Sequence, residues 1–212
     1  VSIEHSRILK DSMLGKKSNV ALTNFICQVD YLRSSEMPKE KVLGESLYST
    51  VKSIIHECLD NGEFLYVRRT DSTPIVRQNG IELSLEKLSS GNIFLIEHLV
   101  MLLCKMYSVC VLNEMDPADI TRIPGILLID EIENHLHPKW QKKILGIIRR
   151  TFPNLQIILT THSPFVVSSI EGARVYTCVS KGDHSVIEDE TDKYTHLPVE
   201  EILASDVFEV SS

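Results

Sequence analysis

Short continuous runs of hydrophobic residues alternate with longer stretches whose hydrophobic residues recur at helical spacing. The runs GILLID (residues 125–130) and LQIILTTH (residues 155–162) have the length and composition of strands that helices cover on both faces. Between them, PKWQKKILGIIRRTF begins with a proline at the first helical position and gathers hydrophobic residues and one threonine on one face, namely Trp140, Ile144, Ile147, Ile148 and Thr151. A strand, a helix and a strand of these lengths predict a right-handed βαβ unit in a parallel sheet.

The flanking segments predict further elements around this unit. Residues 42–62 carry apolar positions at helical spacing and end at Asn61 and Gly62, which predicts an amphipathic helix. A β-meander is predicted downstream of it, in which two strand segments are joined through TDST and Asn79 and Gly80 offer a tight turn. Residues 1–40 are polar and weakly patterned. The remaining expectations are a loop at 34–41, strands at 63–69 and within 73–84, a helix at 92–107, strands at 173–180 and 184–189, and a short helix within 197–210.

Composition limits the class of protein. The 212 residues are 43% hydrophobic and 24% charged, which is typical of a globular protein with one sizeable core or two small ones. A net charge of −7, with basic residues scattered or on single helix faces, does not favour a surface for duplex nucleic acid, although it does not exclude one. Five cysteines without a CxxC pair suggest neither a zinc site nor a disulfide framework, so a reducing cytoplasm fits best.

Membrane insertion is not expected. The chain does not open with a basic segment followed by an apolar one, as a secretory signal would. The apolar stretch 93–112 contains Glu97, His98 and Lys105, and charged groups in the middle of a bilayer are costly. We therefore predict a buried or amphipathic helix there.

Chemistry-bearing side chains follow both predicted parallel strands. Asp130 and Glu131 come at the end of the first strand and His162 at the end of the second, and ligands of open parallel sheets bind at this edge. One carboxylate there can hold hydrated Mg²⁺ while its neighbour polarises a water aimed at a terminal phosphate. A neutral His162, fixed before a helix capped by Ser163 and opened by Pro164, can bond a phosphate oxygen or that water. Taken singly, each group also fits a solvated turn or a structural histidine.

A third candidate element precedes the apolar helix. LSSG, residues 88–91, places two hydroxyls and a glycine at a helix start, where backbone N–H groups and the helix dipole favour an anion such as phosphate. The same residues also fit a simple helix cap. The order of LSSG, the strand ending in DE and the strand ending in TTH is more specific than any part of it.

Three segments resemble the motifs of ABC-type ATPases. KLSSGNIFLIEHLVMLL resembles the signature motif, GILLIDEIENHLHPKWQKKIL the Walker B strand with its D-loop, and FPNLQIILTTHSPFVVSS the switch-histidine strand. The resemblance covers about residues 60–212. Within this group the chain is most similar to AAA-family proteins near RecF, the OLD proteins and the PtuA-like ATPases of bacterial anti-phage systems.

The resemblance implies an α/β fold: the C-terminal lobe of an ATPase head, with a mostly parallel sheet flanked by helices. It divides the chain into a helical and linker segment (1–61), the ATPase lobe (62–180) and a strand-and-helix tail (181–212). It implies ATP and Mg²⁺ as cofactors, with Asp130 supporting the metal, Glu131 as catalytic base and His162 as switch histidine. Residues 133–137 would form the D-loop, with Asn134 at the nucleotide. Ser89, Ser90 and Gly91 would contact the γ-phosphate of nucleotide held by a second subunit.

The implied partners are a second copy of the chain in an ATP-dependent dimer or larger homo-oligomer, an HNH-type nuclease as effector subunit, and nucleic acid. The sequence departs from the pattern at Asn92, where many relatives carry Glu or Gln. It also contains no GxxxxGK[ST] phosphate loop, because its one GK pair, at Gly15 and Lys16, lacks the preceding glycine and strand. We therefore expect that this chain does not hold a nucleotide in the usual way by itself.

Alternative functions stay open at this point. One is a RecF-like or SMC-like ATPase of DNA maintenance, and another is a non-catalytic scaffold that uses the half-fold to bind a partner. Two weaker candidate sites are a metal cluster of Glu133, His135 and His137, and a basic helix face within 139–150 that contacts DNA phosphates. A structural HxH loop and a solvated helix face explain these two features more simply.

Overall fold

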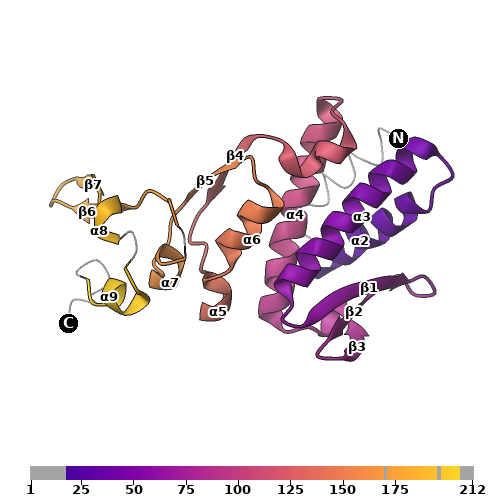
Figure 1. The fold of residues 1–212 in the computed structure, drawn as a ribbon, viewed down its shortest axis with the longest axis horizontal. Helices are drawn as coiled ribbons and strands as arrows, with labels where there is room; N and C mark the ends of the chain where they lie inside the picture. The colour runs from indigo at the N-terminus through magenta and orange to yellow at the C-terminus, as the bar shows by residue number, and fades with distance from the viewer. Residues whose placement is uncertain (1–17, 170, 195–196, 206–212) are drawn as a thin grey trace. The chain divides into compact units, whose positions relative to one another are not determined.

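The computed structural model describes residues 18–169, 171–194 and 197–205 (Figure 1). The chain divides into two compact units. Unit 1 contains the chain up to Gly125 together with residues 150–155, and unit 2 contains residues 126–149 and the chain from Gln156 onward. The expectations for residues 1–17, including the GK pair, and for the end of the tail lie outside the described residues.

Three helices form the body of unit 1: α2 (Ser18–Arg33), α3 (Pro38–Cys58) and α4 (Ser90–Leu112). The amphipathic helix predicted from residue 42 is confirmed as α3, which starts earlier because Pro38 supplies its first turn. The sequence did not predict α2. The expected loop at 34–41 was too long, because α3 already begins at Pro38. The helix nevertheless has a helical pattern of buried residues, namely Leu22, Phe25, Ile26 and Val29.

The antiparallel sheet of unit 1 confirms the predicted meander. Strands β1 (Gly62–Arg68), β2 (Thr73–Gln78) and β3 (Ile81–Ser84) pair in chain order. The β2–β3 turn places Asn79 and Gly80 at φ values of 51° and 80°, as a tight hairpin turn between twisted strands requires. A single turn of 3₁₀ helix, η1 (Leu85–Lys87), then leads toward α4.

Helix α4 is the apolar helix that the sequence predicted. It is long and apolar enough to cross a membrane, but 56% of its most apolar window is buried inside the protein. It packs against α2 and α3, and its buried residues include Leu95, Leu99 and Leu103. The helix therefore serves as a core helix of unit 1, and Ser89 to Gly91 stand at its start. The segment after α4 contains the 3₁₀ helix η2 (Pro117–Arg122).

Close packing of α2 against α3 depends on Gly44. A Cβ atom at this position would overlap the backbone nitrogen of Arg33 and lie 2.5 Å from the carbonyl carbon of Leu32. Both atoms belong to backbone at the end of α2, so no side-chain rotation can relieve the clash. A Cβ atom built on Gly91, at the start of α4, would meet no neighbouring atom within 4 Å.

The strands of the predicted βαβ unit are β4 (Gly125–Ile129) and β5 (Leu155–Leu159), which pair with each other. The predicted helix between them is interrupted: α5 (Pro138–Gln141) and α6 (Ile144–Thr151) are joined by a turn. The expectation that helices cover both strand faces was wrong for the described residues. The exposed fractions of Ile126, Leu128 and Ile158 are 67%, 72% and 52%.

The rest of unit 2 is built from short elements. Helix α7 (Pro164–Val167) follows the end of β5, and strands β6 (Tyr176–Ser180) and β7 (Ser185–Asp189) confirm the predicted pair as an antiparallel hairpin. The structure adds α8 (Thr191–Tyr194), which the sequence did not predict, and confirms a short tail helix as α9 (Val199–Leu203). Unit 2 thus combines a parallel pair with an antiparallel hairpin.

Replacing Gly44 by alanine should destabilise unit 1, because α2 and α3 must separate to admit the methyl group. We expect a loss of about 1–3 kcal/mol in the free energy of unfolding, measured by urea denaturation. Gly91→Ala is the matched control: it adds the same methyl group in open space within a helix, so stability should stay equal or rise slightly. Equal stability of Gly44→Ala and the parent would contradict the close approach of α2 and α3.

Candidate functional site

Three of the predicted site residues stand at the carboxyl ends of β4 and β5. Asp130 and Glu131 directly follow β4, and His162 follows β5 after two threonines. The backbone bonding is that of a parallel pair. Thr160 donates its N–H to the Ile129 carbonyl, and the Thr160 carbonyl accepts the N–H of Ile132. All three side chains are exposed at this common edge. The arrangement is the one expected of a ligand site in a parallel α/β sheet.

Thr160 fastens the two strand ends with its side chain as well. Its hydroxyl donates to Asp130 Oδ1 over 2.5 Å, and its Oγ1 accepts the backbone N–H of Glu131 over 2.8 Å. One side chain thereby fixes the acidic pair from the neighbouring strand. Sequence reasoning missed Thr160. The two threonines in TTH were a usable signal, because a β-branched hydroxyl after a buried strand can bond an adjacent strand without leaving the sheet.

Glu133 joins the segment after β4 to the segment after β5. Its carboxylate accepts the Thr161 hydroxyl at Oε2 and the His162 backbone N–H at Oε1, each over 2.5 Å. Bonds to a charged acceptor are stronger than bonds between neutral groups. The backbone of His162 is therefore held by the carboxylate of Glu133, which the sequence placed in the D-loop region and in a candidate metal cluster.

Glu131 has an unusual backbone and a defined side-chain partner. Its φ of 46° lies in the left-handed region, which costs a non-glycine residue free energy. Asn134 stabilises the turn, since its N–H donates to the Glu131 carbonyl over 3.0 Å and its Nδ2 to Oε2 over 2.5 Å. Asn134, predicted at the nucleotide, thus lies beside Glu131 and orients its carboxylate.

The corner after His162 differs in one detail from the prediction. Ser163 occupies the N-cap position of α7 and Pro164 opens the helix, as expected, but the serine makes no side-chain capping bond. Its hydroxyl donates to Gln141 Oε1 over 2.6 Å, and the Gln141 amide donates to the Leu136 carbonyl over 2.8 Å. The serine thereby ties the corner to α5.

The LSSG element belongs to unit 1. Ser89 is the N-cap of α4 and accepts the Asn92 backbone N–H over 3.3 Å. Ser90 and Gly91 form the first turn and are exposed or half-exposed. Helix capping by Ser89 is therefore observed, and the open space at Gly91 leaves room for a group to approach the helix start.

The residues present fit a magnesium ion better at Asp130 than in the histidine loop. Asp130 is an exposed carboxylate whose Oδ1 bonds Thr160, so Oδ2 can face a hydrated cation, and Mg²⁺ prefers oxygen ligands. The alternative cluster does not form: Glu133 turns to Thr161 and His162, while His137 accepts the Lys139 backbone N–H. Within the described ranges, no three His, Cys, Asp or Glu side chains are grouped as metal ligands.

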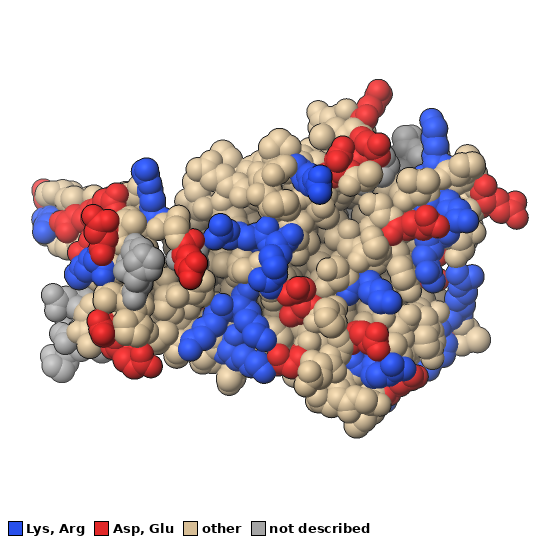
Figure 2. Space-filling model, in the orientation of Figure 1, with Lys and Arg blue, Asp and Glu red and all other residues tan. Residues whose placement is uncertain are grey.

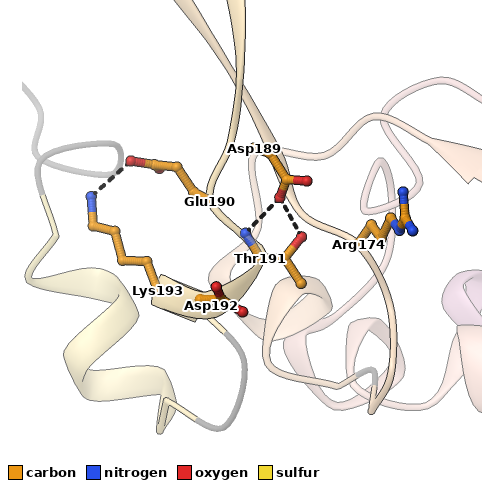
Figure 3. A pocket seen from close by; sticks show the side chains of 6 residues that line it. All are labelled: Arg174, Asp189, Glu190, Thr191, Asp192 and Lys193. Atoms are coloured by element: carbon orange, nitrogen blue, oxygen red, sulfur yellow. Dashed lines mark hydrogen bonds and ion pairs between the residues drawn. The ribbon is translucent and has the colours of Figure 1, made fainter.

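An open polar cavity of about 580 Å³ lies elsewhere in unit 2 (Figure 3). It is lined by residues of both charge signs, namely Arg174, Asp189, Glu190, Thr191, Asp192 and Lys193. The side chain and backbone of Thr191 donate to Asp189 Oδ1, and these bonds lower the pKa of Asp189. Glu190 and Lys193 pair over 3.2 Å. None of the predicted site residues lines this cavity.

Comparisons with known proteins give consistent matches. The family described as "AAA domain, putative AbiEii toxin, Type IV TA system" matches residues 4–168. The chain is 32% identical to the Retron Ec83 probable ATPase of Escherichia coli over 175 residues, which are 79% of this chain and 31% of that protein. It is 40% identical to the Septu protein PtuA of Bacillus thuringiensis over 70 residues, which are 33% of this chain and 16% of that protein.

Among solved structures, an SmcHead bound to the C-winged helix domain of ScpA matches with a TM-score of 0.48 and 14% identity, over 80% of this chain and 53% of that one. The chain spans about a third or less of the length of the curated relatives named above.

The hydrogen bonds from Thr161 and His162 to Glu133 predict that a mutation of Glu133 changes amide exchange at His162. In Glu133→Ala, amide hydrogen exchange at His162 should speed up by about 10- to 100-fold, the equivalent of one hydrogen bond to a charged group. Glu133→Gln is the matched control, because its amide oxygen still accepts the His162 N–H and its Nε2 can donate to Thr161. Exchange should then stay near the parent rate. If the His162 amide exchanges no faster in Glu133→Ala than in Glu133→Gln, the Glu133 carboxylate does not hold the His162 backbone.

Proposed function

The chain belongs to this AAA-domain family, which confirms the resemblance to AAA-type and PtuA-like ATPases, and from that membership we propose that it supplies part of an ATP-hydrolysing site. The site would control an effector in bacterial anti-phage defence, as the resemblance to PtuA-like proteins implies. The effector we favour is an HNH-type nuclease subunit.

The observation that carries the proposal is the shared edge of β4 and β5, where Asp130, Glu131 and His162 follow two parallel strands. Glu131 would accept the proton of the attacking water, with its carboxylate oriented by Asn134. The His162 imidazole would donate to a γ-phosphate oxygen or align the water. Magnesium held near Asp130 would neutralise charge that develops on the phosphates.

We propose that a phosphate loop comes from outside these 212 residues. The motif is absent from the sequence, and the curated relatives are at least three times as long as the aligned part of this chain. Ile126, Leu128 and Ile158 form an exposed aliphatic face on the strands that carry the acidic pair. A lobe that bears the phosphate loop and covers this face would bring nucleotide to the edge where Asp130 and Glu131 stand.

Ser89, Ser90 and Gly91 would act on nucleotide held by a second copy. An uncovered helix start with a glycine in its first turn can accept a phosphate, and a side chain at Gly91 would stand in the way. ATP would then stabilise a dimer with composite sites, in which each copy supplies the acidic pair to one nucleotide and the LSSG element to the other.

The role of Glu131 is tested in a form of the protein that contains the phosphate loop. Glu131→Gln should keep ATP binding but lower the turnover rate by about 10²–10⁴-fold, because an amide can bond the water but cannot take its proton. Glu171→Gln changes an exposed carboxylate elsewhere in unit 2 and should leave turnover unchanged. Turnover of Glu131→Gln within a few-fold of the parent would remove Glu131 from the base role.

The composite site is tested by ATP-dependent dimerisation, measured by sedimentation. Gly91→Arg should abolish the ATP-induced dimer while the monomer keeps its unfolding midpoint, since the position faces open space. Gly91→Ala, with its much smaller side chain, should weaken dimerisation less. If Gly91→Arg dimerises with ATP as well as the parent does, residues 88–91 are a helix cap only.

A further inference from the structure

Four basic side chains line the exposed side of α5 and α6. We call Lys139, Lys142, Lys143 and Arg149 the basic stripe, and all four are exposed. Figure 2 shows Lys and Arg side chains gathered over α5 and α6. Ile144, Ile147 and Ile148 of the same segment are buried, so the basic residues lie on its solvent side. The turn between the helices interrupts the α-helical register, since the Lys143 N–H bonds the Trp140 carbonyl three residues back over 3.0 Å.

The basic stripe is positively charged, whereas unit 2 as a whole is acidic. Unit 2 contains seven Lys and Arg against thirteen Asp and Glu, and four of the seven are in the stripe. Residues 138–150 contain no acidic residue. Positive charge is therefore concentrated on one helix side of an otherwise acidic unit, which attracts a polyanion to that side.

Neighbouring groups hold the basic heads in place. The Lys142 ammonium lies 5.0 Å from the ring centre of Phe165, and the Lys143 ammonium lies 5.3 Å from that of Trp140. Arg149 donates one N–H to the Glu171 carbonyl over 3.3 Å, and a guanidinium has five such donors. Side chains that are positioned before binding lose less entropy when a ligand arrives.

We propose that the basic stripe binds the phosphate backbone of nucleic acid. A protein partner usually meets an interface with an apolar or aromatic centre, but here the exposed residues of the 138–150 segment are Pro138 and cations, and Trp140 is buried. Phosphates require cations only. Four cations can contact about four phosphates of one strand. This inference does not depend on the proposed ATPase activity.

The stripe would meet nucleic acid through its charges, so binding should depend weakly on sequence and strongly on salt. Fluorescence anisotropy of the 212-residue chain with a labelled 20-base-pair duplex should give a dissociation constant of about 10⁻⁴–10⁻⁶ M at physiological salt. A plot of log affinity against log salt should have a slope of about −3 to −4, the value for four phosphate contacts. The same titration with a single-stranded oligonucleotide distinguishes binding to single strands from binding to duplex. Its salt slope should be shallower, about −0.7 per phosphate contact.

Arg149 and Arg150 provide a matched pair of variants. Arg150 is next in the chain, but its guanidinium pairs with Glu57 over 2.6 Å, so its charge is already balanced. Arg149→Gln should reduce the slope by about one and weaken binding about 5- to 10-fold at 0.1 M salt, whereas Arg150→Gln should change affinity less than about 2-fold. Lys142→Gln with Lys143→Gln should reduce the slope by about two. Circular dichroism melting checks that each variant is folded.

Three outcomes overturn the proposal. The first is no duplex or single-strand binding at about 50 mM salt, or equal weakening by Arg149→Gln and Arg150→Gln. The second is competition by polyglutamate as strong as by an oligonucleotide of equal charge, which would assign the stripe to an acidic polypeptide. The third is salt-dependent self-association of the parent that the stripe variants lose, without nucleic-acid binding, which would assign it to the acidic surface of a second copy.

Discussion

Thr160 uses all of its polar groups to hold the ends of β4 and β5 together. Its backbone makes hydrogen bonds to the backbone of Ile129 and Ile132. Its hydroxyl donates to the Asp130 carboxylate and accepts the N–H of Glu131. An isolated parallel pair has few such bonds, and each is worth only about 0.5–1.5 kcal/mol. The placement of the acidic pair therefore depends on this one residue more than on either strand, because the strands themselves are short and partly exposed.

The turn after β4 can be strained because the next strand supports it. Glu131 and His135 have φ values of 46° and 62°, which non-glycine residues adopt at a cost. Thr160 fixes the amide at one end of this turn, and Glu133 fixes its middle to the β5 side. A loop held at two points keeps an unfavourable backbone conformation that a free loop would lose. The strain thus directs Glu131 toward Asn134 instead of along the strand.

The sequence predicted the elements and the location of the site better than its internal bonding. Continuous apolar runs and helical spacing were sufficient for β4, β5, α3 and α4, since these patterns reflect burial directly. Helix α2 was missed because its buried residues lie within a polar background. The exposed face of Ile126 and Leu128 shows the limit of such patterns: an apolar run indicates that a residue favours burial, but not which part of a protein provides it.

The contacts of Glu133 could not be predicted from spacing, because they join residues 28 and 29 positions apart through side-chain oxygens. They have a mechanical consequence. Glu131 and His162 stand on separate strand ends, yet Glu133 is two residues from the first and bonded to the backbone of the second. A displacement of either segment must stretch charge-assisted hydrogen bonds to the other, so the two segments favour moving together. A group that binds at His162 would then change the position of Glu131 without touching it, and Glu133 is the residue through which that coupling passes.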